Sequence, residues 1–290
     1  MIVKPEKEAI SAESKTSPER DALESTLKFA PEEVAPGGKF ETSFLIYAGP
    51  EYYEDLKSFG FGFEQTLMQG TWGAVRHWLF FALRFCQKIT GNYGFAILFM
   101  TFLIKVLFSP FTHMSFESMR KMQVVQPKVK SIQTQFKNDP TRMNKEMMEL
   151  YRRHKVNPMG GCLPMIIQIP IFISFYQVLS QFVELKGVSL WWIKDLTQPD
   201  RLTKIPGIGI DFNLLPILMI GTMIWQQKVT PQQSMSSPEQ AKMMQFMPIM
   251  FGFFFYQLPA GLVLYWTLNN LLTVIHQKIF HHRTPQVSAE

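Results

Sequence analysis

The sequence predicts an all-α integral membrane protein with five transmembrane helices, an amphipathic interfacial helix, a cytoplasmic helical hairpin and a short β remnant near the N-terminus. Of its 290 residues, 47% are hydrophobic and 18% are charged, whereas soluble globular chains have roughly 25% charged residues. Residues 243–277 and 156–183 form runs of 35 and 28 residues without Asp, Glu, Lys or Arg, and runs beyond about 18 residues indicate membrane spans. Ten Lys and Arg, against four acidic residues, gather between residues 111 and 158. This composition excludes a soluble enzyme.

Residues 1–69 are expected to form a flexible segment followed by the remnant of a periplasmic β-domain. Residues 1–38 are rich in Glu, Lys, Ser and Pro and show no hydrophobic period, which predicts flexibility. No apolar stretch follows the first residues, so we expect no signal peptide. Apolar and polar residues alternate over residues 39–47, and this pattern predicts one strand. A single strand cannot bury a face alone, so we interpret it as the end of a larger β-domain.

Residues 70–290 are expected to form the membrane core, beginning with an interfacial helix over residues 71–88. Apolar residues recur there at helical spacing, while His77, Arg84 and Lys88 lie on another side. This pattern is typical of a helix lying on a membrane surface. The alternative is a simple extension of the next helix, but Gly91-Asn92 predicts a break between the two.

Five spans are predicted to follow, at about residues 93–110, 160–183, 212–227, 243–258 and 262–277. The basic loop over residues 112–158 should lie in the cytoplasm. The N-terminal region then lies outside and the C-terminus lies in the cytoplasm. The last three spans have only about 16 residues, or about 24 Å against a hydrocarbon core of about 30 Å, and short spans thin the bilayer locally.

The cytoplasmic loop itself is predicted to be a helical hairpin. Asn138-Asp139-Pro140 supplies a stop, an N-cap and a first-turn proline between its two helices. Methionine-rich surfaces adapt to varied apolar partners. Ordinary packing is the alternative for any single methionine. The residues of the hairpin expected to contact a partner are Met119, Arg120, Lys121, Met122, Met147 and Met148.

Lys105 is the most informative single residue, because a cation within hydrocarbon is costly and therefore a functional candidate. It lies about 18 Å from the outer end of its helix, at about 1.5 Å per residue from Tyr93. The alternative is that its side chain snorkels to the inner interface near Pro110. The position of Lys105 alone supports these two interpretations equally.

The pattern of neighbouring polar residues favours a hydrophilic groove. One polar stripe follows the first span from Thr101 through Lys105, and a second follows the last span from Tyr265. Polar side chains in lipid need partners or water, so two such stripes predict a wet groove. For Gln168 and Asn270, helix-to-helix hydrogen bonding remains a fair alternative. The expected groove residues are Lys105, Thr101, Ser109, Gln168, Tyr265, Asn269 and Thr273.

The sequence offers no set of residues for catalysis, metal binding or a cofactor. No pair of intramembrane aspartates and no mid-span histidine is present, and there is no phosphate-binding glycine loop. His276, His281 and His282 are poorly spaced for one metal ion. Cys86 and Cys162 fit no metal or redox spacing. We therefore expect no enzyme activity and no nucleic-acid-specific site.

Several separated motifs resemble the YidC family of membrane-protein insertases, over about residues 70–290. The most specific runs from Val156 to Pro164 (Val-Asn-Pro-Met-Gly-Gly-Cys-Leu-Pro) and continues in Gln168-Ile169-Pro170-Ile171-Phe172. The other matching segments are Met119-Arg120-Lys121-Met122, Gln126-Pro127-Lys128, Leu214-Leu215-Pro216-Ile217-Leu218-Met219, Phe246-Met247-Pro248 and Pro259-Ala260-Gly261-Leu262-Val263-Leu264-Tyr265-Trp266.

The resemblance implies an insertase of the bacterial inner membrane with a groove whose cation lies on the first core helix, matched here by Thr101-Phe102-Leu103-Ile104-Lys105. Family members usually carry Arg there, so Lys105 is a departure that keeps the charge without the guanidinium fork. A further departure is that the N-terminal anchor and most of the β-domain of Gram-negative members are missing. The implied partners are nascent membrane proteins, the ribosome, the Sec translocon and membrane lipids. A small-solute transporter is the alternative, disfavoured because we find no inverted repeat.

Overall fold

The computed structural model describes residues 2–5, 11–17, 22–47, 49–68, 70–157, 160–161, 163–204, 211–230 and 238–281. The chain divides into two compact units, Met1–Phe63 and Glu64–Glu290. Cys162 and His282 lie outside the described residues.

The N-terminal unit consists of paired strands and a short helix. Strand β1 (Ile2–Pro5) pairs antiparallel with β4 (Phe44–Tyr47), and β2 (Ser11–Ser17) pairs antiparallel with β3 (Ala22–Lys28). Helix α1 (Tyr53–Ser58) buries Tyr53 and Leu56, and the 3-10 helix η1 (Phe63–Met68) follows. The expectation of a flexible segment over residues 1–38 was therefore wrong where β1, β2 and β3 lie. Main-chain hydrogen bonds pair these polar strands, and a search for hydrophobic alternation cannot detect such pairing.

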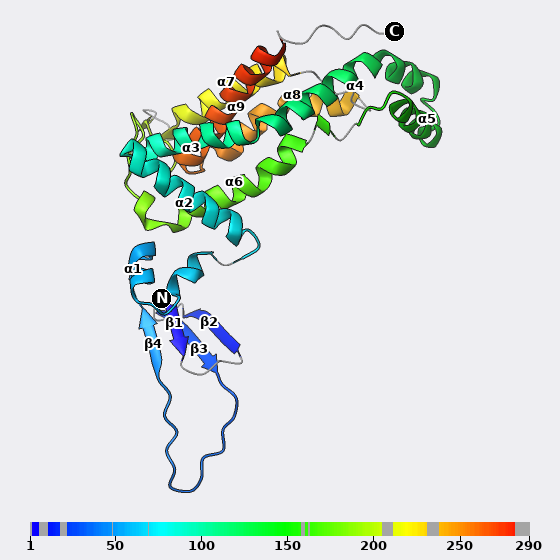
Figure 1. Cartoon of the computed structure of the whole chain (residues 1–290). Coiled ribbons are helices and arrows are strands. Elements are labelled where there is room, and N and C mark those ends of the chain that lie inside the picture. The colour runs from blue at the N-terminus through cyan, green and yellow to red at the C-terminus, as the bar shows by residue number, and fades with distance from the viewer. Residues whose placement is uncertain are drawn as a thin grey trace. The chain divides into compact units, whose positions relative to one another are not determined.

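The second unit is helical, as predicted, and five helix pairs form most of its packing (Figure 1). Helices α2 (Gly73–Thr90) and α3 (Tyr93–Leu107) pack together. Helix α2 also packs on α6 (Leu163–Gln181). Helix α9 (Ala260–His281) packs on α3 and on α7 (Leu214–Val229), and α8 (Pro238–Phe255) packs on α7.

The break predicted at Gly91-Asn92 is confirmed. Gly91 ends α2 in a left-handed conformation (φ 77°), which glycine adopts without steric cost. The Asn92 side chain then accepts a hydrogen bond of 2.6 Å from the backbone N–H of Gly94 and caps α3. The two helix axes differ by 117°. Helix α2 is therefore not an extension of α3.

The predicted hairpin is formed by α4 (Ser109–Gln135) and α5 (Pro140–Arg153), which extend beyond the other helices of this unit (Figure 1). Asp139 accepts a hydrogen bond of 3.0 Å from the backbone N–H of Arg142 and caps α5, as predicted. Helix α4 begins only one residue after α3 ends, with Pro110 in its first turn, where proline is tolerated.

One described helix, α6, is long and apolar enough by itself to cross a membrane. Helices α2 and α3 reach this length and apolarity only as a bent pair, and residues 243–255 form a shorter apolar helix. Helices α3 and α7 have only 15 and 16 residues. The count of five spans therefore stays a prediction.

The loop between α6 and α7 is folded against the N-terminal ends of two helices. It contains the 3-10 helix η3 (Val183–Leu185) and the short strands β5 (Thr203–Lys204) and β6 (Asp211–Phe212). The backbone N–H of Gly261 donates to the Leu196 carbonyl over 2.8 Å, and Leu215 N–H donates to the Asp200 carboxylate over 2.7 Å. Because these bonds satisfy N–H groups that the first turns of α7 and α9 leave open, they hold this loop to the bundle.

Candidate functional site

A polar cluster lies where α3 contacts α9, and its centre is Lys105. The Lys105 ammonium donates to the Thr273 hydroxyl over 2.6 Å and to the Asn269 amide oxygen over a longer 3.4 Å. Thr273 donates its own hydroxyl proton to the Asn269 carbonyl over 2.6 Å. Because that proton is already used, the hydroxyl oxygen turns its lone pairs toward Lys105. The two predicted polar stripes therefore do face each other.

The cluster continues for one more turn toward the end of α9. Ser109 Oγ lies 3.0 Å from His276 Nε2. The His276 ring also lies near the Phe116 ring on α4, with 5.9 Å between the ring centroids. Polar contacts thus run from Lys105 to the junction of α3 and α4.

Lys105 is stabilised by neutral groups. Among the residues that the structure describes, no carboxylate lies within ion-pair distance of it. Helix α3 ends at Leu107, so Lys105 occupies its last turn. Backbone carbonyls give this end of a helix a negative potential that favours a cation. The sequence placed the helix end at Pro110 and so missed this contribution.

Gln168 and Tyr265 form a separate polar pair between α6 and α9. The Gln168 amide donates to the Tyr265 hydroxyl over 2.6 Å. Tyr265 is buried, and its ring packs edge-on against Phe175 with 5.3 Å between centroids. Tyr265 lies one turn before Asn269 on α9, so this pair extends the same row of polar groups.

Two expected polar residues have structural roles instead. Thr101 is buried, and its hydroxyl donates to the Ile97 carbonyl of its own helix over 2.6 Å. The expectation that Thr101 lines the groove was wrong, because a threonine within a helix can satisfy its hydroxyl on the preceding turn. Asn270 donates to the Thr222 hydroxyl on α7 over 3.3 Å, which matches the alternative of helix-to-helix bonding.

The methionines expected to contact clients divide into two groups. Met119, Met122 and Met147 are buried, and the last two belong to the hydrophobic core between α4 and α5. For these three, ordinary packing was the better interpretation. Met148 is 62% exposed.

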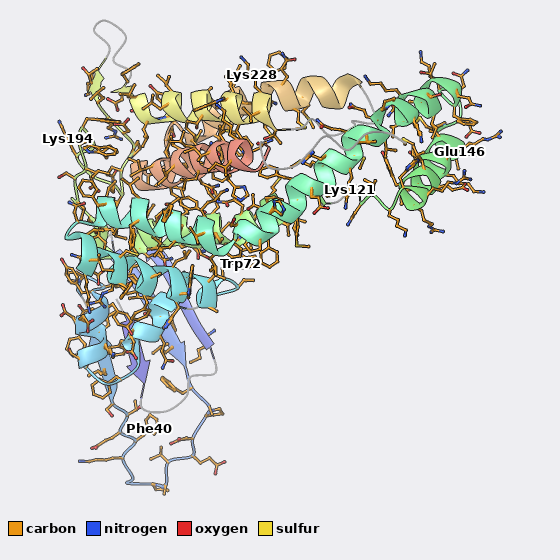
Figure 2. The ribbon with its side chains drawn as sticks, turned by 45° about the horizontal axis from the view of Figure 1, so that its top comes forward. Phe40, Trp72, Lys121, Glu146, Lys194 and Lys228 are labelled. Carbon is orange, nitrogen blue, oxygen red and sulfur yellow. The ribbon has the colours of Figure 1, made fainter. Side chains whose placement is uncertain are left out.

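The hairpin also presents charged side chains, which project from α4 and α5 around Lys121 and Glu146 in Figure 2. Lys121 pairs with Glu117 over 2.8 Å, and both side chains are more than half exposed. The hydrogen bond from Lys121 and its positive charge hold the pKa of Glu117 below its usual range. Arg120, Lys121 and Met148 are therefore the expected contact residues that remain accessible at least in part.

One buried cation was missed by the sequence analysis. Arg76 on α2 is 4% exposed, and its guanidinium donates to the side-chain oxygens of Gln181, over 3.0 Å, and Gln177, over 3.3 Å. Burial lowers the pKa of Arg76 from its usual value. Arg76 lies one turn before Leu79 and Phe80, within the apolar face of α2. Gln177 and Gln181 are spaced one turn apart on α6. This pair of polar residues in an apolar segment was the signal in the sequence that could have indicated a buried partner.

Candidate metal ligands do not cluster among the described residues. Within the described ranges, no three side chains of His, Cys, Asp or Glu lie close enough to hold a metal ion together. Cys86 is a free, buried thiol, and burial raises its pKa. The site is thus a row of one cation with neutral hydrogen-bonding groups, enclosed by apolar helices.

Comparison with known proteins gives one consistent family. The model of the family described as 60Kd inner membrane protein matches residues 85–287. The membrane protein insertase YidC of Geobacter sp. (strain M21) is 42% identical over 94% of this chain and 49% of its own length. That of Pelobacter propionicus is 43% identical over 88% of this chain and 47% of its own. The chain spans about half the length of the curated relatives it matches.

A solved structure is also similar. It is described as an active YidC insertase crystal structure with the first transmembrane domain resolved. The TM-score is 0.56 at 26% identity, over 81% of this chain and 55% of the other.

Proposed function

This chain belongs to the 60Kd inner membrane protein family, and from this premise we propose that it is a membrane-protein insertase. It would receive hydrophobic segments of nascent proteins and release them sideways into the lipid bilayer, without nucleotide or metal. The observation that carries the proposal is the contact of Lys105 with Thr273, where a cation within apolar helices is bound only by neutral groups among the described residues. The charge is thus held in place without being neutralised, and it remains available to a client.

The groove is proposed to consist of Lys105, Ser109, Gln168, Tyr265, Asn269 and Thr273, with His276 added. A polar client segment crossing a membrane needs substitutes for its hydration. The row of hydroxyl and amide groups on α9 supplies hydrogen-bonding partners. Lys105 supplies a positive charge that attracts acidic client residues on their way outward.

We propose that α3, α6, α7, α8 and α9 are the five spans. At about 1.5 Å per residue, α3 and α7 extend about 22 and 24 Å, less than a hydrocarbon core of about 30 Å. Shorter spans thin the surrounding bilayer, which shortens the path of a polar segment. The basic hairpin favours an orientation with α4, α5 and the C-terminus in the cytoplasm and the N-terminal region in the periplasm.

The hairpin of α4 and α5 is proposed to receive clients or ribosomes before insertion. Arg120 and Lys121 offer positive charge, and the exposed thioether of Met148 offers an adaptable apolar contact. The Sec translocon is a further proposed partner, on the resemblance alone. Deletion of residues 116–154 should abolish insertion while the other helices stay folded. Normal insertion by that deletion variant would remove the hairpin from the mechanism.

Reconstitution tests the function as a whole. The protein is placed in liposomes without ATP, and insertion of a short single-span client is followed by protease protection. We expect insertion by the wild type and by Lys186→Glu, a charge reversal on the exposed loop between α6 and α7, but not by Lys105→Glu. Uptake of small solutes without client insertion would instead support a transporter.

A further inference from the structure

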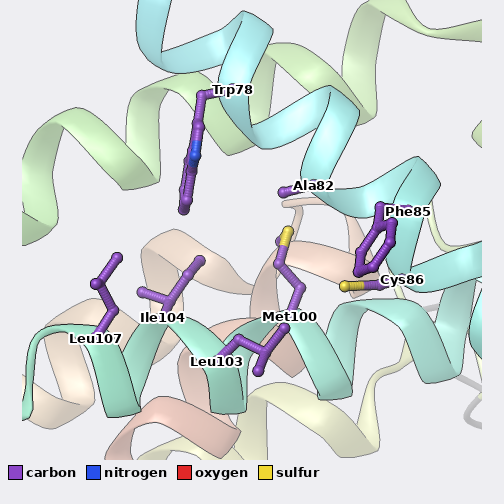
Figure 3. Close-up of a pocket in the computed structure, with 8 residues that line it drawn as sticks. All are labelled: Trp78, Ala82, Phe85, Cys86, Met100, Leu103, Ile104 and Leu107. Atoms are coloured by element: carbon purple, nitrogen blue, oxygen red, sulfur yellow. The ribbon is translucent and has the colours of Figure 1, made fainter.

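An apolar wedge separates part of α2 from α3 (Figure 3). Its volume is about 100 Å³, and all of its lining side chains are apolar or weakly polar. In Figure 3, Trp78 points from α2 toward the space beside Ile104 and Leu107, and Phe85 faces Leu103. The wedge exists because the two axes differ by 117° and so diverge from the bend at Gly91.

The wedge is open at the surface of the helix bundle. The four side chains at its rim, Trp78, Phe85, Leu103 and Leu107, are between 41% and 61% exposed. A space of this volume is large enough for water, but an apolar cavity stays dry because water finds no partners there. An empty wedge would forfeit dispersion contacts along its walls. Hydrocarbon is therefore the filling that its chemistry favours.

The same helix carries a cationic row on another of its sides. Arg84 and Lys88 are one turn apart on α2, and His77 lies two turns before Arg84 on the same side. The Arg84 guanidinium lies over the Phe80 ring, 5.6 Å from its centroid. An amphipathic molecule with an anionic head and an apolar tail matches this pairing of charge and wedge.

The orientation of α2 fits such a molecule. If α3 lies along the membrane normal, the 117° bend leaves α2 at 117° − 90° = 27° from the membrane plane. A helix at this inclination lies near the level of the headgroups, with its apolar face toward the acyl chains. The open rim of the wedge then faces hydrocarbon, and the cationic row faces phosphate.

We propose that the wedge between α2 and α3 binds part of an acyl chain of an anionic phospholipid from the outer leaflet, whose phosphate is bound by Arg84 and Lys88. This inference rests on the proposed function, because it takes α3 as a membrane span. The lipid completes the packing of α2 on α3, next to the helix that carries Lys105.

Photocrosslinking tests the acyl-chain contact without any client. The whole protein is reconstituted into vesicles of phosphatidylethanolamine and phosphatidylglycerol, the latter with a diazirine in its acyl chain, and the adducts are mapped by mass spectrometry. We expect adducts on the rim residues to exceed several-fold those on Phe102 and Val106, which lie on another face of α3 and are 49% and 56% exposed. Adducts in proportion to exposure alone would overturn the proposal.

Matched variants separate a specific wedge from general lipid contact. Ala82→Trp fills the wedge and should remove the rim adducts, whereas Ile89→Trp adds the same ring to an exposed position of α2 outside the wedge and should not. Unchanged rim adducts in Ala82→Trp would count against the wedge. If Ala82→Trp does not fold, Leu103→Phe, a smaller addition at the rim, serves the same comparison.

The headgroup is tested by exchanging the photoreactive lipid for the phosphatidylcholine analogue. Wild type should favour phosphatidylglycerol, and Arg84→Gln/Lys88→Gln should lose that preference. Lys186→Gln/Lys194→Gln, which removes two charges from the loop between α6 and α7, should keep it. Equal labelling of the wild type by both lipids would overturn the proposal that the bound headgroup is anionic. Client insertion is measured in the same vesicles, so normal insertion without rim adducts would overturn this inference and leave the proposed function standing.

Discussion

Arg76 and Lys105 each lie between two helices, and they are bound differently. Arg76 lies between α2 and α6, where two glutamine side chains receive its guanidinium and Phe80 stacks on Phe182 with 3.9 Å between centroids. Lys105 lies between α3 and α9, where it has one short and one long hydrogen bond and stays partly exposed. A fully enclosed guanidinium fixes two helices together, whereas a partly exposed ammonium can still be reached by another molecule. We therefore expect Arg76 to stabilise the fold and Lys105 to act on clients.

Loss of the Arg76 guanidinium should have the largest effect on stability. Arg76→Ala leaves the side-chain oxygens of Gln177 and Gln181 without this donor inside the helix contact, and we expect a cost of about 3 kcal/mol for two hydrogen bonds to a charged group. The measurement is the thermal unfolding of the purified protein in detergent. Arg84→Ala on the same helix is the control and should cost less than about 1 kcal/mol, because Arg84 is only half-buried. Equal losses in both variants would contradict the assignment of Arg76.

The hairpin offers a second contrast, between neighbouring methionines. Met147→Ala should destabilise the contact of α4 with α5 by about 2 kcal/mol, because it opens a cavity in their core. Met148→Ala should change stability by less than about 0.5 kcal/mol, since this side chain is exposed. Limited proteolysis of the hairpin measures the difference. Crosslinking to a client should show the reverse order of effects, and a client contact that depends on Met147 but not on Met148 would contradict our division of the methionines.

The sequence could predict those features that depend on neighbouring residues. The bend at Gly91-Asn92, the cap at Asp139-Pro140 and the facing stripes of α3 and α9 all follow from turn chemistry or helical spacing. Features that depend on distant partners could not be predicted. The burial of Arg76 requires two glutamines of α6, the burial of Met147 requires α4, and the pairing of β1 with β4 is made by main-chain groups that any sequence possesses.

Two threonines of similar burial provide a smaller contrast within the bundle. Thr273→Val removes the acceptor that lies 2.6 Å from the Lys105 ammonium, and we expect a cost of about 1 kcal/mol, the typical worth of one hydrogen bond. Insertion should fall as well, because Lys105 is no longer held toward α9, and Thr273→Ser should restore it. Thr101→Val is the control, since the Thr101 hydroxyl bonds only to its own helix. A loss of insertion in Thr101→Val, with none in Thr273→Val, would reverse their roles.

Substitution of Lys105 itself should change insertion most. Its partners Asn269 and Thr273 are neutral, so Lys105→Ala strands no buried charge. A tenfold change in rate or affinity corresponds to about 1.4 kcal/mol. Two unit charges 4 Å apart near a protein surface interact by about 4 kcal/mol. The charge of Lys105 is therefore large enough to discriminate among clients by tenfold.

The most direct test of the central claim measures insertion rates of one neutral and one acidic client in ATP-free liposomes, normalised to the amount of insertase. Lys105→Arg should retain activity, because the positive charge persists. Lys105→Glu should fail with the acidic client, since a buried acid either stays neutral or repels the client's own acidic residues. Lys105→Ala should lose mainly the acidic client, by about tenfold, which corresponds to about 1.4 kcal/mol. Equal rates for both clients across the whole series would contradict the account and leave Lys105 as an anchor at the membrane interface.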